Sequence, residues 1–317
     1  MAWSSATSSG LLPDPPNLLQ LTPYGVVKCN KSRGCATLAA MSDGALVLVA
    51  TPIGNLDDLS ARAAAALATA DAIACEDTRR TGRLLAHVGI AAPKLLVANE
   101  HTERDLAPEV VRRVAAGERV AIVSDAGMPG ISDPGEALVR AVLDAGLAVE
   151  VIPGPSAADS ALVVSGLSTG RFVFEGFLPR KGSGRRERLA EVAAERRTTV
   201  LYEAPHRLAR TLGDLVEVCG GDRRVALLRE LTKLHEEHWR GTLAEALART
   251  DEVEPRGEYV MVVEGAAPEE PADDDVLRAA LAEARGAGRS TSDAVDEVAT
   301  RFGAPRRHVY SLALDAR

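Results

Sequence analysis

The sequence lacks an apolar run long enough to cross a lipid bilayer, which takes about 20 residues in a helix. The strongest candidate, Ala61–Cys75, is interrupted by Arg62 and Asp71, so we interpret it as part of a soluble protein. No basic segment precedes an apolar core near the N-terminus, which argues against a secretory signal. We therefore predict a cytoplasmic protein with no membrane partner.

Cysteine is also scarce. The four cysteines (Cys29, Cys35, Cys75 and Cys219) form no C-x-x-C pair, and none has a histidine nearby at the spacing of zinc ligands. In a reducing compartment we expect free thiols, and we predict no metal.

Two common nucleotide-binding motifs are missing as well. No G-x-G-x-x-G follows the first predicted strand, and the chain has no G-x-x-x-x-G-K-[ST] loop. The formal net charge of −8 argues against a protein that coats nucleic acid over its whole surface. A local basic patch remains compatible with that charge.

Residues 1–44 are rich in Ser, Pro, Gly and Asn and show no lasting helical or strand period. We predict a disordered N-terminal extension here. Because Met41 opens a segment that leads directly into a strand, we interpret the first 40 residues as an upstream extension. A transit peptide is the alternative, favoured by the scarcity of acidic residues.

Residues 45–168 alternate short apolar runs with helical stretches. Uniformly apolar strands separated by helices are typical of a parallel sheet covered on both faces. We therefore predict an N-terminal α/β domain that binds its ligand at the carboxyl ends of the strands. The predicted strands are Leu46–Ala50, Ala72–Cys75, Lys94–Val97, Val120–Ser124 and Val149–Ile152.

A second α/β domain is predicted over residues 169–265. Residues 266–275 form an acidic, Pro-containing linker. Residues 276–317 are predicted to form three short helices, and Phe302–Tyr310 resembles the turn and second helix of a helix-turn-helix. The strands predicted in the second domain are Phe172–Phe174, Thr199–Tyr202, Arg224–Leu228 and Glu258–Val263.

The densest chemical signal is the segment Val123–Gly135, which follows a predicted buried strand and contains Asp125, Asp133, three glycines and two prolines. A rigid loop of this composition can bring backbone groups against a ligand, while Asp125 or Asp133 accepts hydrogen bonds from ribose hydroxyls or an amine. The alternative is a tight turn in which Ser132 or Asp133 caps a following helix over 136–144. We favour the ligand loop, because capping leaves the Gly-Met-Pro part without a role.

This loop resembles the Ser-Asp-Ala-Gly-x-Pro-x-Ile-Ser-Asp-Pro-Gly signature of the ribosomal RNA small subunit methyltransferase I family. That family belongs to the tetrapyrrole-methylase, or class III, group of S-adenosylmethionine enzymes. Met128 departs from the usual Thr, and Thr102 from the usual Asn of a His-Asn-Glu triplet. The resemblance also covers 50–56, 75–79, 152–157, 176–181, 202–207, 229–236 and 257–260.

The resemblance implies two α/β domains of the tetrapyrrole-methylase type, with the methyl donor in the cleft between them, followed by the helix-turn-helix-like module. It also implies a homodimer that uses S-adenosyl-L-methionine to methylate a cytidine 2′-hydroxyl in 16S rRNA, either free or within the 30S ribosomal subunit. The donor contacts that it implies are Thr51, Pro52, Gly54, Asp125, Ala126, Gly127, Met128, Pro129, Ser132, Pro153, Ser156, Ala157, Tyr202, Glu203, Ala204 and Glu258.

A ribose hydroxyl is a weak nucleophile at neutral pH, so a base or a cation that stabilises the alkoxide should assist its methylation. Within the matching segments, Lys233 is the candidate alkoxide stabiliser and His101 or Glu203 the candidate base. Glu76, Asp77 and His206 lie in these segments too. For each of these residues, a salt bridge or helix cap is the alternative role.

RNA binding is predicted for five cations within nine residues, where intervening glycines would allow a loop to contact phosphates. They are Arg180, Lys181, Arg185, Arg186 and Arg188. The alternative is the solvated start of a helix. The C-terminal helices are either a second RNA contact or a packing module.

Two other functions fit the same fold. One is C-methylation of a corrinoid or porphyrin precursor, and the other is a non-catalytic RNA-binding factor. The basic segment and the C-terminal helices favour RNA as the substrate, while the nearly intact donor loops favour catalysis.

Overall fold

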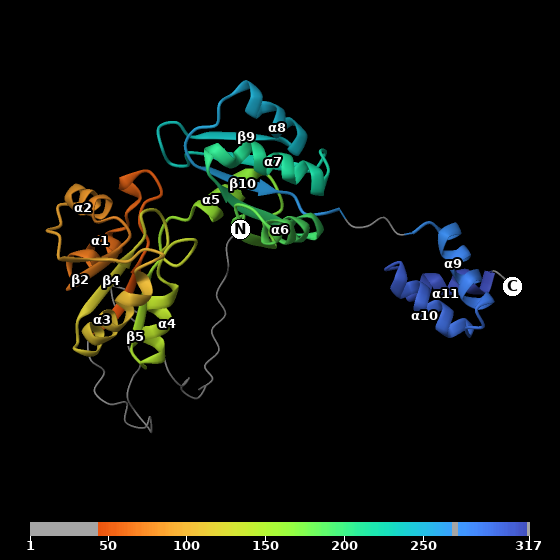
Figure 1. Ribbon diagram of the computed structural model, residues 1–317, viewed down its shortest axis with the longest axis horizontal. Coiled ribbons are helices and arrows are strands. Elements are labelled where there is room, and N and C mark those ends of the chain that lie inside the picture. The colour runs from red at the N-terminus through yellow and green to blue at the C-terminus, as the bar shows by residue number, and fades with distance from the viewer. Residues whose placement is uncertain (1–43, 268–271, 316–317) are drawn as a thin grey trace, which may run out of the picture.

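The computed structural model describes residues 44–267 and 272–315. Two α/β units lie next to each other, and a group of three helices follows them (Figure 1). Apart from Gly44, the predicted N-terminal extension lies outside the described residues, as do Cys29 and Cys35. Cys75 and Cys219 are free thiols. No helix among the described residues is long and apolar enough to cross a membrane.

The first unit is built on a five-stranded sheet in the order β3-β2-β4-β1-β5, and every pairing is parallel, as predicted. Helices α1 and α2 cover one face and α3 and α4 the other, with a separate apolar core on each face. The strands are β1 (Ala45–Val49), β2 (Ala72–Cys75), β3 (Lys94–Val97), β4 (Arg119–Val123) and β5 (Ala148–Ile152). The helices are α1 (Ala61–Ala68), α2 (Thr78–His87), α3 (Glu103–Ala115) and α4 (Glu136–Asp144), and a 3-10 turn spans Leu56–Asp58.

The second unit has a mixed sheet in the order β6-β7-β10-β8-β9, in which only β6 and β7 are parallel. Residues of α6, α7 and α8 form an apolar core with one set of strand side chains. The strands are β6 (Phe172–Phe177), β7 (Thr198–Glu203), β8 (Arg224–Arg229), β9 (Glu237–Thr242) and β10 (Tyr259–Val263). The helices are α6 (Ser183–Ala194), α7 (Pro205–Cys219) and α8 (Leu243–Glu252).

Helix α5 (Ala157–Ser165) covers the other face of this second sheet. Its Ala161 and Leu162 are buried against Val200 of β7 and Val262 of β10. This packing corrects the division predicted at residue 168, which assigned α5 to the first domain. The chain passes between the units in the Pro153-Gly-Pro155 segment, because proline and glycine end β5 before Ser156 caps α5.

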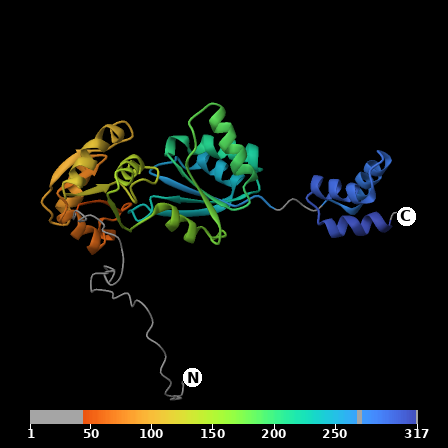
Figure 2. The same ribbon diagram turned by 90° about the horizontal axis from the view of Figure 1, so that it is seen from below.

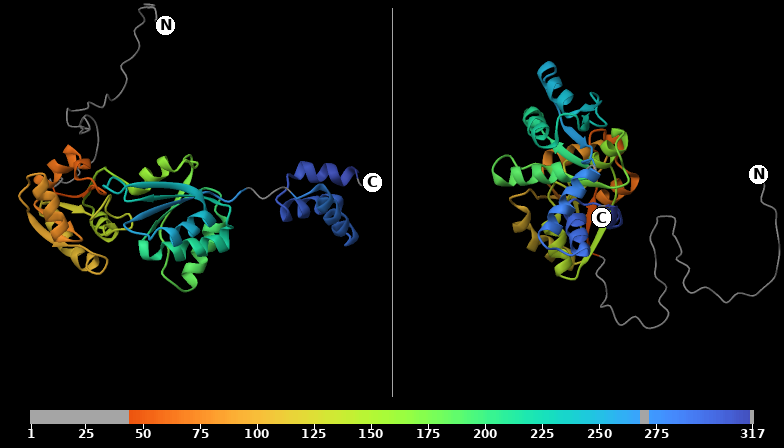
Figure 3. Two further views of the ribbon diagram at one scale, coloured as in Figure 1. Left: turned by 90° about the horizontal axis from the view of Figure 1, so that it is seen from above. Right: turned by 90° about the vertical axis from the view of Figure 1, so that its right-hand side faces the viewer.

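Three C-terminal helices confirm the predicted all-helical segment. They share a core that includes Leu281, Val295 and Val309, and Figures 2 and 3 show them set apart from both α/β units. The predicted linker ends earlier than residue 275, because the Asp273 side chain caps a helix that already includes Asp274. The helices are α9 (Asp274–Gly286), α10 (Thr291–Arg301) and α11 (Arg306–Asp315).

Candidate active site

A cavity of ≈ 480 Å³ has walls from both α/β units. The first unit contributes the loop after β4, and the second contributes the ends of β6 and β7 and the start of β10. The structure therefore brings together most of the predicted donor-contact residues. Those in the wall are Ala126, Gly127, Met128, Ser132, Ser156, Ala157, Tyr202, Glu203, Ala204 and Glu258. Those that do not line it are Thr51, Pro52, Gly54, Asp125, Pro129 and Pro153.

Thr51 supports the cavity from behind. Its backbone exchanges two hydrogen bonds with Gly127, at 2.8 and 3.1 Å, and its buried hydroxyl donates to the Ser124 carbonyl at 3.1 Å. The Ser124 hydroxyl in turn donates to the Gly127 carbonyl at 3.0 Å. Gly127 has a φ of 87°, which favours glycine. The ends of β1 and β4 are thereby locked together beneath the cavity wall.

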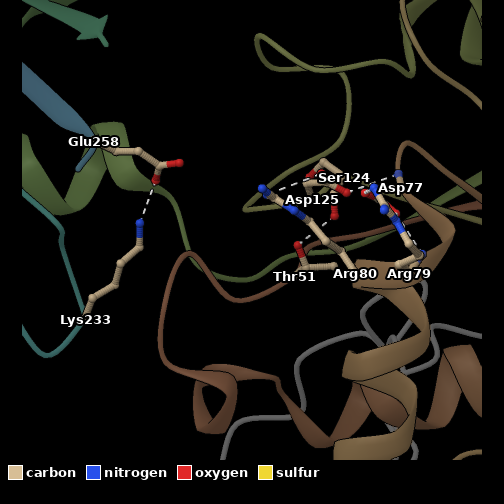
Figure 4. A network of polar contacts seen from close by, with 8 residues as sticks. All are labelled: Thr51, Asp77, Arg79, Arg80, Ser124, Asp125, Lys233 and Glu258. Carbon is tan, nitrogen blue, oxygen red and sulfur yellow. Dashed lines mark hydrogen bonds and ion pairs between the residues drawn. The ribbon is translucent and has the colours of Figure 1, made fainter. Parts of the chain in front are cut away.

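Asp125 is held at the start of α2, not at the cavity. Its carboxylate accepts a hydrogen bond from the Asp77 backbone N–H at 3.3 Å and lies 3.4 Å from the Arg80 guanidinium (Figure 4). Asp77 caps α2, and its hydrogen bonds from Arg79 lower its pKa to about 2. Asp77 is therefore a helix-capping carboxylate.

Asp133 borders two hollows. Together with Ser132 it lines both the cavity and an open groove of ≈ 1060 Å³ in the first unit. Burial, with the nearby carboxylates of Glu76 and Asp125, raises the pKa of Asp133 to about 7. Ser132 adopts a left-handed φ of 60°, which is unusual for a non-glycine residue. A carboxyl that titrates near neutrality thus stands where the two hollows meet.

Neither Ser132 nor Asp133 caps α4, so the capping alternative is wrong. The helix begins after Gly135, and no side chain at that position caps it. Instead the Glu103 carboxylate accepts hydrogen bonds from the backbone N–H groups of Gly135, Ala137 and Leu138, at 2.8, 2.8 and 3.1 Å. The first N–H groups of a helix have no acceptor within the helix and carry the positive end of its dipole, which favours a buried carboxylate there.

Gly54 lies where the two units approach each other closely. A Cβ at this position would lie 2.5 Å from Lys233 Cγ and 2.7 Å from Thr232 Oγ1, so only glycine fits. The next residue, Asn55, donates its backbone N–H to Thr232 Oγ1 at 3.0 Å. Thr232 has a φ of 65°, a strained value for a β-branched residue. The turn after β1 is therefore joined to the loop after β8.

Two of the predicted catalytic residues line the cavity. The buried Glu203 accepts a hydrogen bond from the Thr211 hydroxyl at 2.6 Å and lies 3.1 Å from the Arg207 guanidinium. Lys233 Nζ donates to Glu230 at 3.0 Å and to Glu258 at 2.7 Å, and Figure 4 shows the Lys233–Glu258 pair apart from the Asp125 group. Both charges are already balanced by protein groups.

His101, the third predicted catalytic residue, is exposed and lines the open groove, not the cavity. Its backbone N–H donates to the Asn99 side chain at 3.0 Å. His206, at the start of α7, does line the cavity. Among residues 44–267 and 272–315, no group of three His, Cys, Asp or Glu side chains is placed to hold a metal ion.

Comparison with known proteins identifies the family. Residues 45–247 match the model of the Tetrapyrrole (Corrin/Porphyrin) Methylases. Ribosomal RNA small subunit methyltransferase I of Synechocystis is 46% identical over 274 residues, which are 86% of this chain and 98% of the relative. The protein of that name from Mycobacterium tuberculosis (strain H37Rv) is 47% identical over 279 residues, 87% of this chain and 97% of the relative. The chain belongs to the ribosomal RNA small subunit methyltransferase I family.

Solved structures support the fold of this family member. Uroporphyrin-III C-methyltransferase from Thermus thermophilus, complexed with S-adenosylhomocysteine, gives a TM-score of 0.52 at 19% identity and covers 70% of this chain and 97% of its own. A cobalt-precorrin-4 methyltransferase gives 0.53 at 16% identity, with 72% and 98% covered. At these identities the likeness shows the fold alone, and the predicted tetrapyrrole-methylase architecture is confirmed.

Several apolar residues of the cavity wall were not among the predicted donor contacts. Ile53, Leu231 and Val260 come from three distant segments of this methyltransferase and meet at the junction of the two units. Two further wall residues, Ile131 and Phe177, have exposed fractions of 49% and 51%. In the sequence all five are ordinary core-type residues, and only the tertiary fold distinguishes them.

The basic segment divides into two groups. The predicted phosphate contact of Arg185 is wrong, because its side chain is buried and donates to Asp214 at 2.7 Å and to Thr211 at 2.9 Å. Arg188 forms ion pairs with Glu175 and Glu191. The segment is also not one loop, since α6 begins at Ser183. Of the five predicted cations, only Arg180, Lys181 and Arg186 are exposed without a carboxylate partner.

Proposed function

We propose that this family member transfers a methyl group from S-adenosyl-L-methionine to the 2′-hydroxyl of a cytidine in 16S rRNA. The observation that carries the proposal is the cavity itself, where Ala126–Asp133 of the signature loop 124–135 in one unit faces the ends of β6 and β7 and the start of β10 in the other. Family membership supports the reaction class, and the groove that adjoins the cavity at Ser132 and Asp133 offers the substrate a way in.

The residues of the cavity fit the donor. Its volume of ≈ 480 Å³ is within the range of about 300–1,000 Å³ for small-molecule sites. Ile53, Leu231 and Val260 offer an apolar surface that suits an adenine ring, while the Asp133 and Glu258 carboxylates suit ribose hydroxyls and an amine. When bound, the donor supplies a methyl group on a positively charged sulfonium.

Asp133 is the group that we assign to the substrate proton. It lies where the cavity meets the groove, and its carboxyl titrates near neutral pH, which suits a general base. As the 2′-oxygen bonds to the methyl carbon and the carbon–sulfur bond breaks, the hydroxyl proton passes to this carboxylate. The walls around it orient the reacting groups.

The other candidates receive supporting roles. Glu203 positions the start of α7 through Arg207 and Thr211, because both of its oxygens are engaged. Lys233, held between Glu230 and Glu258, fixes the strained loop beside the cavity. An alkoxide-stabilising role for Lys233 would require it to exchange one carboxylate for the substrate oxygen.

The test uses 30S subunits from a strain that lacks the corresponding modification. Incubation with the protein and donor should add 2′-O-methylcytidine to the 16S rRNA, detected by mass spectrometry of nuclease digests, whereas Asp133→Asn should retain the fold and lose most of the activity. Methylation of a corrinoid or porphyrin precursor, with none of either free 16S rRNA or 30S subunits, would overturn the proposal.

We further propose a homodimer that works in the cytoplasm, where 16S rRNA and 30S subunits occur. Two apolar side chains support the dimer: Val151 on the edge strand β5 and Val163 on α5 have exposed fractions of 54% and 68%. Contiguous exposed apolar patches are typical of contact surfaces. Light scattering after size-exclusion chromatography should give twice the 33.3 kDa mass of the chain.

A further inference from the structure

The segment 171–197, from the start of β6 to the start of β7, has a charge opposite to that of the whole protein. It contains eight cations and four carboxylates, whereas the chain has a formal net charge of −8. The segment is exposed along one edge of the second sheet, because β6 is an edge strand and α6 packs beside α7.

Five of the eight cations in this segment have no partner. Between residues 171 and 267, every Lys or Arg outside the segment is engaged in a hydrogen bond or ion pair. Inside it, Arg185, Arg188 and Arg197 are engaged in the same way. The exposed cations left without a hydrogen bond or ion pair are Arg171, Arg180, Lys181, Arg186 and Arg196. We call these five residues the α6 cation track.

The track has two ends, one at each end of α6. Arg180, Lys181 and Arg186 surround the start of the helix, just after Phe177, whose side chain lines the cavity. Arg171 and Arg196 lie at the far end, where both line one open groove of ≈ 840 Å³. The 12-residue helix separates the two ends by about 18 Å.

The far end adjoins the root of the C-terminal helices. The backbone N–H of Ala266 donates to the Glu195 carbonyl at 2.6 Å. Gly265 approaches the Arg196 backbone so closely that a Cβ there would lie 2.0 Å from the Arg196 carbonyl oxygen. The chain therefore leaves the second unit toward α9–α11 beside Arg196.

We propose that RNA leaving the cavity follows the α6 cation track to the root of the C-terminal helices. This inference rests on the proposed function, because it takes the substrate to be RNA. An arginine without a carboxylate partner can bind a phosphate through two parallel hydrogen bonds without breaking an existing ion pair. Phosphate contacts of this kind orient a nucleic acid and do not read its bases.

The decisive variant removes the two arginines at the far end of the track. Neither of them belongs to the basic segment 180–188 that the sequence predicted to bind RNA. Arg171→Ala with Arg196→Ala should reduce the slope of log affinity against log salt by roughly 1.4 to 1.8, since each phosphate contact contributes about 0.7 to 0.9. The probes are unmodified 30S subunits and a 16S rRNA transcript, with binding measured by filter retention of the full-length protein over a salt series.

The matched control is Lys94→Ala with Arg256→Ala, which also removes two exposed cations, each of them paired with a carboxylate. Its salt slope should equal that of the wild type, and neither double variant should change donor affinity in calorimetry. If R171A/R196A has the slope of the control, the track is overturned while the proposed function stands. If the wild type binds donor but neither RNA probe, both fail together.

Discussion

The backbone N–H of Asn55 donates to the hydroxyl of Thr232 at 3.0 Å, which joins the turn after β1 to the loop after β8. The two segments belong to different α/β units, and Ile53 and Leu231 beside them both line the cavity. The shape of the cavity therefore depends on this contact between the units. Because Thr232 holds a left-handed φ of 65°, its conformation is maintained by the surrounding contacts.

Thr232→Val should weaken donor binding by about fivefold, because it removes one hydrogen bond worth about 1 kcal/mol and leaves the Asn55 N–H unpaired. Isothermal titration calorimetry with S-adenosyl-L-methionine measures the change. Thr232→Ser, which keeps the hydroxyl, is the matched control and should bind as the wild type does. Equal Kd values for the two variants would show that the hydrogen bond does not shape the cavity.

Donor affinity should rise with pH through about 7, the pKa of Asp133 in the free protein. Below that pH the Asp133 carboxyl is mostly protonated and therefore neutral. Because a positively charged donor stabilises the ionised carboxylate, donor binding releases a proton. Between pH 6 and pH 8 the affinity should increase about tenfold. Calorimetry in two buffers of different ionisation enthalpy measures the released proton directly. Asp133→Asn should show neither the pH dependence nor the proton release, and a wild-type pH dependence in D133N would refute the assignment.

Asp133 should also make the free energy of unfolding depend on pH. Its contribution to stability should fall as pH rises, whereas donor affinity rises. The pKa of Asp133 is higher in the folded protein than in the unfolded chain, so its contribution favours folding below about pH 4 and is lost as pH rises through about 7. Asp133→Asn removes this loss. Relative to the wild type, D133N should therefore have a higher urea midpoint at pH 8 than at pH 5. A constant difference between the two proteins at both values would contradict the raised pKa.

Glu103→Ala should lower the free energy of unfolding by about 2 kcal/mol, because it leaves three backbone N–H groups at the start of α4 without their acceptor. Urea denaturation followed by circular dichroism gives the value. Glu136→Gln, at an exposed position in the first turn of the same helix, is the control and should change stability by less than about 0.5 kcal/mol. Similar losses in both variants would mean that Glu103 acts only as one more surface charge.

Adjacent arginines should give opposite phenotypes. Arg185→Ala should cost about 2–3 kcal/mol of stability, since it breaks a buried charge-assisted hydrogen bond to Asp214 and leaves Thr211 with one bond fewer. Arg186→Ala should leave stability unchanged and reduce the salt slope of RNA binding by roughly 0.7 to 0.9. Denaturation and filter binding on both variants separate the two roles, and a reduced salt slope with unchanged stability in R185A would reverse them.

The alternation of helices and strands predicted the first sheet almost strand by strand, because β1 and β2 are apolar throughout, β4 is apolar after Arg119, and all three are largely buried. The pattern failed at β9, whose sequence Glu-His-Trp-Arg-Gly-Thr has no apolar run. As an edge strand it is held by backbone pairing with β8, and hydropathy does not record backbone pairing. Helix α8 was missed with it.

The site was predictable where one loop carries it and not where distant side chains meet. The motif of the signature loop 124–135 predicted most of the residues that this loop contributes to the cavity wall. The burial of Arg185 depends on Asp214, 29 positions away, and the start of α4 on Glu103, 32 positions from Gly135. Such long-range pairs leave no periodic trace in a single sequence. Asp133 was recognised as a ligand-loop carboxylate, but its raised pKa comes first from burial in the folded protein and then from the proximity of Glu76 and Asp125.

The position of α5 has a consequence for biosynthesis. The helix leaves the ribosome before any of the strands on which it packs, and one of them, β10, ends only at Val263. On a nascent chain the first sheet can be completed at β5. The apolar side of α5 stays exposed until nearly a hundred further residues, through the end of β10, have been synthesised. Because Glu258 and Val260 line the cavity together with the signature loop, a newly made molecule acquires the proposed donor cavity only once the second sheet closes. Donor binding to ribosome-bound chains of increasing length would time that event.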